Sequence, residues 1–280
     1  MRSVKSVIAA GAVSFLSQAA FAADLAIAPS PMYAPPPVEE FGGWYLRGDI
    51  GMTNQHLKQL DNPGDPNAAH FASTGMGFDS GALFDLGVGY QFNNWFRADV
   101  IGQWRGRSNF HGSQFAPVGV FGANFTEANN YSGSKSEAVV MANAYFDLGT
   151  WWYVTPYVGA GIGGSYNRIS GFRDDGVIIN GGVLSNSVTY AGDAGKWNFA
   201  WALHAGLGYR VTPNVTLELG YSYMNLGDAV TGTTNSFDGV TVVNGSGFVM
   251  KDITSHDLKL GVRWDLETPP VYAPPIIRKG

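Results

Sequence analysis

Charged side chains recur on one face of several alternating segments of this 280-residue chain. The set comprises Arg47, Asp49, Asp85, Arg97, Asp99, Asp147, Glu218, Lys259 and Arg263. Both signs are present, and buried charges are tolerable only when they are paired and hydrogen-bonded. Two chemistries fit such a set: ion pairs that fill an interior, or a path for ions.

A glycine-rich run, Gly159-Ala160-Gly161-Ile162-Gly163-Gly164, formally contains the spacing of a dinucleotide-binding loop. That fingerprint needs a strand before it and a helix after it. The following residues, Ser165–Arg168, start no helix. We therefore interpret the run as a strand in which glycine relieves crowding on a narrow inner face.

Metal and catalytic sites find little support in the sequence. The five histidines, His56, His70, His111, His204 and His256, show no metal-ligand spacing, and we expect His204 to be a hydrogen-bonded interior residue. The acidic runs Asp61–Asp65 and Asp174–Gly176 lack the full calcium-loop pattern, and we interpret them as solvated loop tips. No Ser/His/Asp set can be assembled. The sequence predicts no enzyme, no metal and no cofactor.

The composition is unusual for a soluble protein. Charged residues make up only 14 %, against roughly 25 % in soluble domains, while the chain has 38 glycines and 14 % aromatics. These proportions favour a sheet whose outer face meets lipid. The absence of cysteine excludes disulfides and thiolate metal sites. The net charge of −5 makes the chain a poor nucleic-acid binder on electrostatic grounds.

Met1–Ala22 has the three parts of a secretory signal. Arg2 and Lys5 form the charged end, Val7–Leu16 is the apolar stretch, and Ala20-Phe21-Ala22 predicts cleavage between Ala22 and Ala23. The apolar stretch is short for the ~20 residues that a spanning helix needs. We expect an exported protein of net charge −7, with 15 basic and 22 acidic residues left after removal of Arg2 and Lys5. Any membrane contact must then be made by strands.

About eight alternating strands are predicted. They cover Trp44–Met52, Ala82–Phe92, Trp95–Trp104, Glu137–Leu148, Val154–Tyr166, Trp197–Arg210, Val215–Tyr223 and Lys259–Leu266. Their connections alternate between a few residues and roughly 27 to 32, far beyond an ordinary hairpin loop. Tryptophan and tyrosine gather at both ends of the strands, where membrane interfaces are expected. The sequence predicts an all-β, eight-stranded antiparallel up-and-down transmembrane β-barrel with long extracellular loops.

We expect this barrel to cover residues 44–266, after a signal peptide at 1–22 and a Pro-rich periplasmic leader at 23–43. A second Pro-rich periplasmic tail follows at 267–280. About eight strands leave room for side chains rather than a water channel, so we favour ion pairing over an ion path for the charge set.

The last strand carries Lys259, Gly261, Trp264 and Leu266 in an order that resembles the closing-strand signal of bacterial outer-membrane barrels. Together with the signal peptide, Ala23-Asp24 and Phe41–Tyr45, it makes the chain similar to the small OmpA-like outer-membrane barrels of alphaproteobacteria. Proteins of this family are often described as surface antigens or porin-family proteins. In the family the signal usually ends the chain, whereas here Glu267–Gly280 follows it.

The resemblance implies location in the bacterial outer membrane, contact with its lipid and lipopolysaccharide, and insertion by the barrel assembly machinery. Some members are joined to peptidoglycan through a mature Ala-Asp start, so the α-amine of Ala23, followed by Asp24, is a possible attachment point. The chain itself would then perform no catalysis, because a separate transpeptidase would transfer the acyl group to its amine.

The expected function is envelope structure and surface interaction, and three alternatives stay open. A porin for small solutes needs extra strands, folded from Ile178–Tyr190 or Val240–Val249. A ligand or host-surface binder would act through the loops. A secreted soluble barrel would carry its apolar face inside. The alternating loop lengths and the aromatic rims favour the membrane.

Overall fold

A computed structural model describes residues 42–65, 70–116, 119 and 121–266. The signal peptide, nearly all of the Pro-rich leader and the whole tail lie outside the described residues. So do the predicted cleavage and attachment positions, Ala22, Ala23 and Asp24. Thirteen strands within the described residues form one antiparallel sheet. In this part of the chain, no helix has the length and apolarity that a membrane crossing needs.

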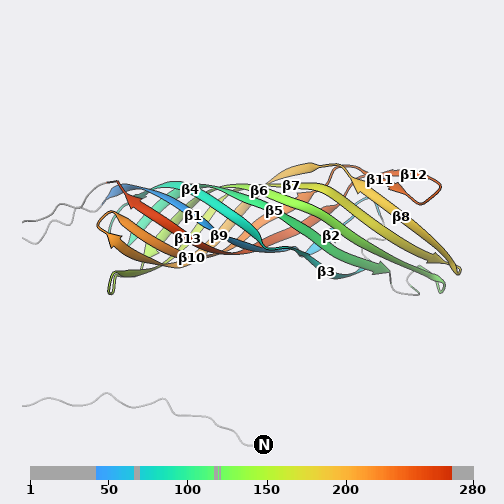
Figure 1. Cartoon of the computed structure of the whole chain (residues 1–280), viewed down its shortest axis with the longest axis horizontal. Helices are drawn as coiled ribbons and strands as arrows, with labels where there is room; N and C mark the ends of the chain where they lie inside the picture. Colours follow the sequence, from blue (N-terminus) through green and yellow to red (C-terminus); the bar gives the residue numbers. More distant parts are fainter. Residues whose placement is uncertain (1–41, 66–69, 117–118, 120, 267–280) are drawn as a thin grey trace, which may run out of the picture. The chain divides into compact units, whose positions relative to one another are not determined.

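Eight of these strands close into a ring (Figure 1). They are β1 (Gly43–His56), β4 (Gly81–Gln91), β5 (Phe96–Ala116), β6 (Phe125–Asp147), β7 (Val154–Asn180), β9 (Ala194–Thr212), β10 (Val215–Val230) and β13 (Val249–Asp265). Each pairs antiparallel with the next, and β13 returns to pair with β1. The predicted eight-stranded up-and-down barrel is confirmed.

The long connections were predicted as loops, and this is corrected by the structure, because much of their length is strand. β5, β6 and β7 contain 21, 23 and 27 residues, whereas a membrane crossing needs about 9–11. Five shorter strands join them: β2 (Gln59–Asp61), β3 (Ala72–Phe78), β8 (Val183–Ala191), β11 (Thr234–Phe237) and β12 (Val242–Gly245). Beyond the membrane, outward polar side chains are solvated by water, so backbone pairing can continue past the apolar band.

The segments considered as extra porin strands form β8 and β12, which lie outside the ring, apart from end residues that belong to β7 and β13. β8 pairs with β7 and with β11, and β11 pairs with β12. These strands lengthen one end of the barrel and add nothing to the number of strands around the lumen. Figure 1 shows them at the end opposite the first residues of β1.

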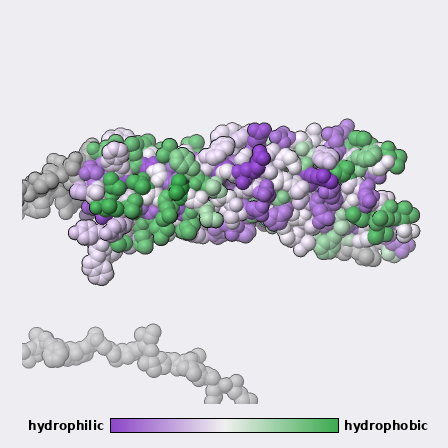
Figure 2. Space-filling view, in the orientation of Figure 1, coloured by the Kyte–Doolittle hydropathy of each residue, from purple (hydrophilic) through white to green (hydrophobic). Residues whose placement is uncertain are grey.

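An apolar band surrounds the short-turn half of the barrel, and Figure 2 shows one face of it. It is formed by outward side chains such as Leu46, Ile50 and Leu260, which are 44 %, 62 % and 61 % exposed. At its outer edge Trp104 lies beside Phe84 and Ala138, and the next positions around the ring are Tyr166 and Trp197. Leucines fully exposed to water would be unfavourable in such numbers, so this band is the surface that meets lipid.

Candidate functional site

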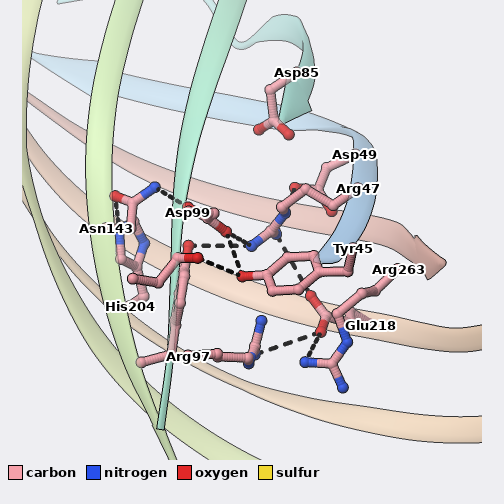
Figure 3. Close-up of polar contacts among 12 residues, drawn as sticks. Tyr45, Arg47, Asp49, Asp85, Arg97, Asp99, Asn143, His204, Glu218 and Arg263 are labelled. Atoms are coloured by element: carbon pink, nitrogen blue, oxygen red, sulfur yellow. Dashed lines mark hydrogen bonds and ion pairs between the residues drawn. The ribbon is translucent and has the colours of Figure 1, made fainter. Parts of the chain in front are cut away.

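The nine residues of the predicted charge set, here called the lumen charge set, are all buried inside the apolar band. They come from six ring strands, β1, β4, β5, β6, β10 and β13, and a seventh, β9, adds the polar partner His204. The ion pairs join all nine into one network. Figure 3 shows its centre.

Arg47 and Glu218 are the two hubs of this network. The Arg47 guanidinium lies 2.6 Å from Asp49, 3.1 Å from Asp99 and 3.5 Å from Glu218. Glu218 also receives Arg97 at 3.4 Å and Arg263 at 3.5 Å. Each side chain is therefore held by partners from other strands, which fixes its position in the lumen.

Polar neutral groups complete the layer. Asn143 donates to Asp99 at 2.8 Å, and the Tyr45 hydroxyl donates to the same carboxylate at 3.2 Å. His204 lies within hydrogen-bond distance of Ser222 (2.8 Å) and Asn143 (3.1 Å), so it is a bonded interior residue. Among the described residues, no group of three or more His, Asp or Glu is placed to hold a metal ion.

The closing-strand residues divide between the two faces of β13. Lys259 points inward to Asp85 at 3.4 Å, and Trp264 lies on the outer face. A Cβ at Gly261 would overlap the Asp49 carboxylate, so only glycine fits there without displacing a network member. Just after β13, the Leu266 amide donates to the Trp44 carbonyl at 2.9 Å.

The glycine-rich run Gly159–Gly164 lies wholly within β7 and pairs with β6 and β9. At Gly161 an added Cβ would overlap the Asn143 side-chain oxygen, and at Gly163 it would overlap the backbone of β6. These are close approaches of neighbouring strands. The strand interpretation therefore holds, and the run is not the start of a helix.

A second charge cluster, which sequence reasoning missed, lies next to the first. It consists of Gln55, Arg105, Lys135, Glu137 and Asp257, all buried. Lys135 and Arg105 contact the carboxylates of Glu137 and Asp257, and Gln55 donates to Glu137 at 2.6 Å. The sequence does contain a signal for this cluster, because Arg105 continues the inward series Arg97, Asp99, Ile101 and Gln103 at period two. The predicted strand ends at Trp104 and therefore excludes Arg105.

An aromatic plug follows the second charge cluster. It consists of Phe78, Phe110, Tyr131, Phe172 and Phe248, each at most 6 % exposed. Phe172 lies 4.8 Å from Phe248 and 6.1 Å from Phe110, measured between ring centroids. Ile169, Met224 and Leu226 belong to the same buried cluster. The described interior thus passes from charged layers to an apolar layer.

Beyond the plug, at the long-hairpin end, lies a cavity of about 210 Å³, here called the mouth pocket. Asn62, Asp65 and Asp174 line it, so the fold brings the two acidic runs together. The expectation of solvated loop tips is wrong for Asp174, which is 8 % exposed. Burial raises the pKa of Asp174 to about 7, with a smaller contribution from Glu127 and Asp175. The pairing of β7 with β6 and β8 encloses it.

Residues 8–265 match the family model described as "Outer membrane protein beta-barrel domain". An uncharacterized protein of Brucella suis biovar 1 is 33 % identical, over 74 % of this chain and 76 % of its own length. A protein of Rickettsia bellii named a putative adhesin is 28 % identical, over 80 % of this chain and 88 % of its own.

Among solved structures, Neisserial surface protein A covers 80 % of this chain and 97 % of its own, with a TM-score of 0.42 and 19 % identity. The outer membrane protein OprG of Pseudomonas aeruginosa covers 80 % and 96 %, with a TM-score of 0.46 and 14 % identity.

Proposed function

Since this chain belongs to the family of outer membrane β-barrel domains and lies in the bacterial outer membrane, we propose that it is a closed, non-catalytic barrel that acts through its outer end. The observation that carries this proposal is a pair of apolar patches on two hairpins at the end of the barrel opposite the short turns. They stand beyond the lipid band, where water rather than lipid is the surrounding medium.

These patches, called the hairpin tips, lie on two hairpins. The first is formed by Val177, Ile179, Val183 and Leu184 at the turn between β7 and β8. The second is formed by Phe237 on β11, Val242 and Val243 on β12, and Val240 in the turn between them. Figure 2 shows hydrophobic surface at this end, separated from the lipid band by polar surface.

Apolar side chains gathered at a solvent-exposed tip mark an interaction surface, because their burial against a partner is favourable. Leu184 and Val242 are 61 % and 67 % exposed, and Val240 is 87 % exposed. Relatives named putative adhesins support the same role. The proposed partner is a protein on the surface of another cell.

Polar replacement of the hairpin tips tests this role. Bacteria displaying Ile179→Asn/Leu184→Asn or Phe237→Asn/Val242→Asn are expected to adhere several-fold less to a host-cell monolayer than bacteria with the wild type. Asn186→Gln, an exposed change on the same hairpin that adds no polarity, is the control and should adhere normally. The role is wrong if both double variants adhere as the wild type does while equal amounts reach the surface.

The filled interior supports this proposal over a porin. The lumen charge set, the second charge cluster and the aromatic plug follow one another along the barrel, and each is composed of buried side chains with named partners. Small barrels of eight strands have interiors that side chains can fill. A solute would have to displace ion pairs such as Arg47–Asp99 and Arg105–Asp257 to pass.

The envelope-structure part of the proposal rests on the leader. The α-amine of Ala23, with Asp24 beside it, would be acylated by peptidoglycan, and the Pro-rich segment 23–43 would provide reach at ~3.1 Å per residue. We expect muramidase digestion of purified cell wall to release an N-terminal peptide that carries a muropeptide adduct, detected by mass spectrometry. A peptide carrying only a free amine would remove this role and leave the surface role standing.

Insertion by the barrel assembly machinery belongs to the same proposal. The outer face of β13 ends in Trp264, followed by Leu266, and its inner face leaves room only for glycine at position 261. β13 pairs with β1, so this strand is the one that closes the ring. The barrel assembly machinery would then recognise the same strand whose pairing with β1 closes the sheet and removes its free edges.

A further inference from the structure

The mouth pocket is a closed-bottomed cavity that the surface role does not use. Its lining comes from the segment after β2 and from β5, β6, β7, β8, β11 and the residue before β13. Tyr131 and Phe248 line it and also belong to the aromatic plug, so the plug forms its floor. At about 210 Å³ it is smaller than the roughly 300–1,000 Å³ of pockets for drug-sized ligands. It fits a group the size of one side chain.

The charge of the lining has one sign. Asp65, Glu127 and Asp174 contribute carboxylates, and among the described residues that line the cavity none is a lysine, arginine or histidine. An anionic ligand would meet repulsion from all three. A cation would meet attraction that is strengthened by the low local dielectric.

Asp174 supplies an independent sign of a missing partner. It is 8 % exposed, and its Oδ1 has no hydrogen-bond donor among the described residues. A buried carboxylate oxygen without a donor is costly, and the raised pKa of Asp174 reflects that cost. A ligand carrying both positive charge and N–H groups would satisfy it.

The other polar groups are already engaged and hold the walls in place. Asn129 donates to Glu127 at 2.9 Å, and the Tyr131 hydroxyl donates to Gln114 at 2.9 Å. Thr189 and Ser236 are hydrogen-bonded to each other at 2.7 Å. The pocket is therefore built before a ligand arrives, which lowers the entropic cost of binding.

Aromatic rings complete the lining. Phe71, Tyr131 and Phe248 bring ring surfaces to the same cavity as the carboxylates. Ring faces attract organic cations and pack against alkyl chains. Since no group of three or more His, Asp or Glu in the described residues is placed to hold a metal ion, the combination fits an organic cation better than a metal.

We propose that the mouth pocket binds a primary ammonium group on a short alkyl chain, held by the carboxylate of Asp174. Two sources share this chemistry: a free diamine, or a lysine side chain presented by another protein. The inference does not depend on the hairpin tips, since none of their residues lines the cavity.

Titration calorimetry of the full chain, folded in detergent micelles at fixed ionic strength, tests this inference. Cadaverine and a blocked lysine, Nα-acetyl-lysine-N-methylamide, are the probes. Saturable binding of cadaverine alone assigns a free diamine, and comparable binding of both assigns a lysine side chain. Asp174→Asn should weaken binding at least about tenfold, as expected when a charged hydrogen-bond partner is lost.

Asp175→Asn is the matched control. Asp175 is the next residue along β7, half-exposed on the other face and paired with Arg173 at 2.6 Å, and it does not line the cavity. Its replacement should change affinity by less than about twofold. Compact mobility on an unboiled gel checks that each variant is folded, and Glu127→Gln replaces Asp174→Asn if the latter does not fold.

Three results would overturn the inference. They are no saturable binding of either amine, equal affinity in Asp174→Asn and the wild type, and binding of calcium chloride alone that Asp174→Asn abolishes. This test is independent of the adhesion test: whether or not the hairpin-tip variants lose adhesion, the binding results are interpreted in the same way.

Discussion

Replacing Arg105 with methionine is expected to lower the free energy of unfolding by about 3–5 kcal/mol. Arg105 is fully buried, and its guanidinium contacts Asp257, which is also fully buried. It further donates to Thr53 and Ser255, each at 2.9 Å. Methionine retains much of the apolar stem, so the loss comes from the carboxylate of Asp257, which is left buried beside a single hydroxyl, that of Ser255.

Denaturant unfolding of the barrel in lipid vesicles measures this loss. Arg105→Met/Asp257→Asn should recover a large part of it, because no lone charge then remains in the interior. Arg173→Met removes an exposed guanidinium paired with Asp175 and should leave stability nearly unchanged. If Arg105→Met is no less stable than Arg173→Met, the second charge cluster does not hold the barrel together.

Replacing Leu260 with arginine is expected to destabilise the barrel in lipid vesicles by about 2–4 kcal/mol. Leu260 faces outward on β13 between Ile50 of β1 and Leu219 of β10, in the middle of the apolar band. An arginine there places a charge in hydrocarbon, where nothing replaces its hydration.

Leu184→Arg is a closely matched control, because both leucines are 61 % exposed on a strand. Leu184 lies on β8, outside the ring and beyond the apolar band, so the same substitution meets water and should cost little. Equal losses for both variants, measured as shifts of the unfolding midpoint, would mean that the band containing Leu260 does not face lipid.

The ring could be predicted from sequence because alternation and short turns are local signals. Period two placed Arg47, Asp99 and Lys259 on one face, and the structure shows all three inside the barrel. The individual ion pairs could not be predicted. Glu218 meets Arg47, Arg97 and Arg263 only because the register of the closed ring sets three strands around it.

The strand ends were predicted too short for a physical reason. Beyond the second charge cluster the interior becomes apolar: Phe110, Ile169 and Phe172 point inward, while Arg168 and Arg173 point outward. The rule of apolar outside and polar inside holds only within lipid. Outside the lipid, the extended barrel packs an apolar core as a soluble protein does. A prediction based on lipid-facing residues therefore ends each strand at the membrane interface.

The mouth pocket could not be foreseen at all from spacing. Asp65 and Asp174 come from connections that are far apart in sequence, and each run alone is a common loop composition. Only the pairing of β7 with β6 and β8 buries Asp174, while the segment after β2 brings Asp65 to the same cavity.

We propose that side chains close this barrel from the lumen charge set to the aromatic plug. Single-channel recording of the purified, folded wild-type protein in planar lipid bilayers tests it most directly. We expect no sustained current steps above those of a protein-free bilayer, because Arg47, Glu218, Arg105 and Phe172 occupy the passage. Stable, large conductance steps from the wild type would contradict it and establish a pore.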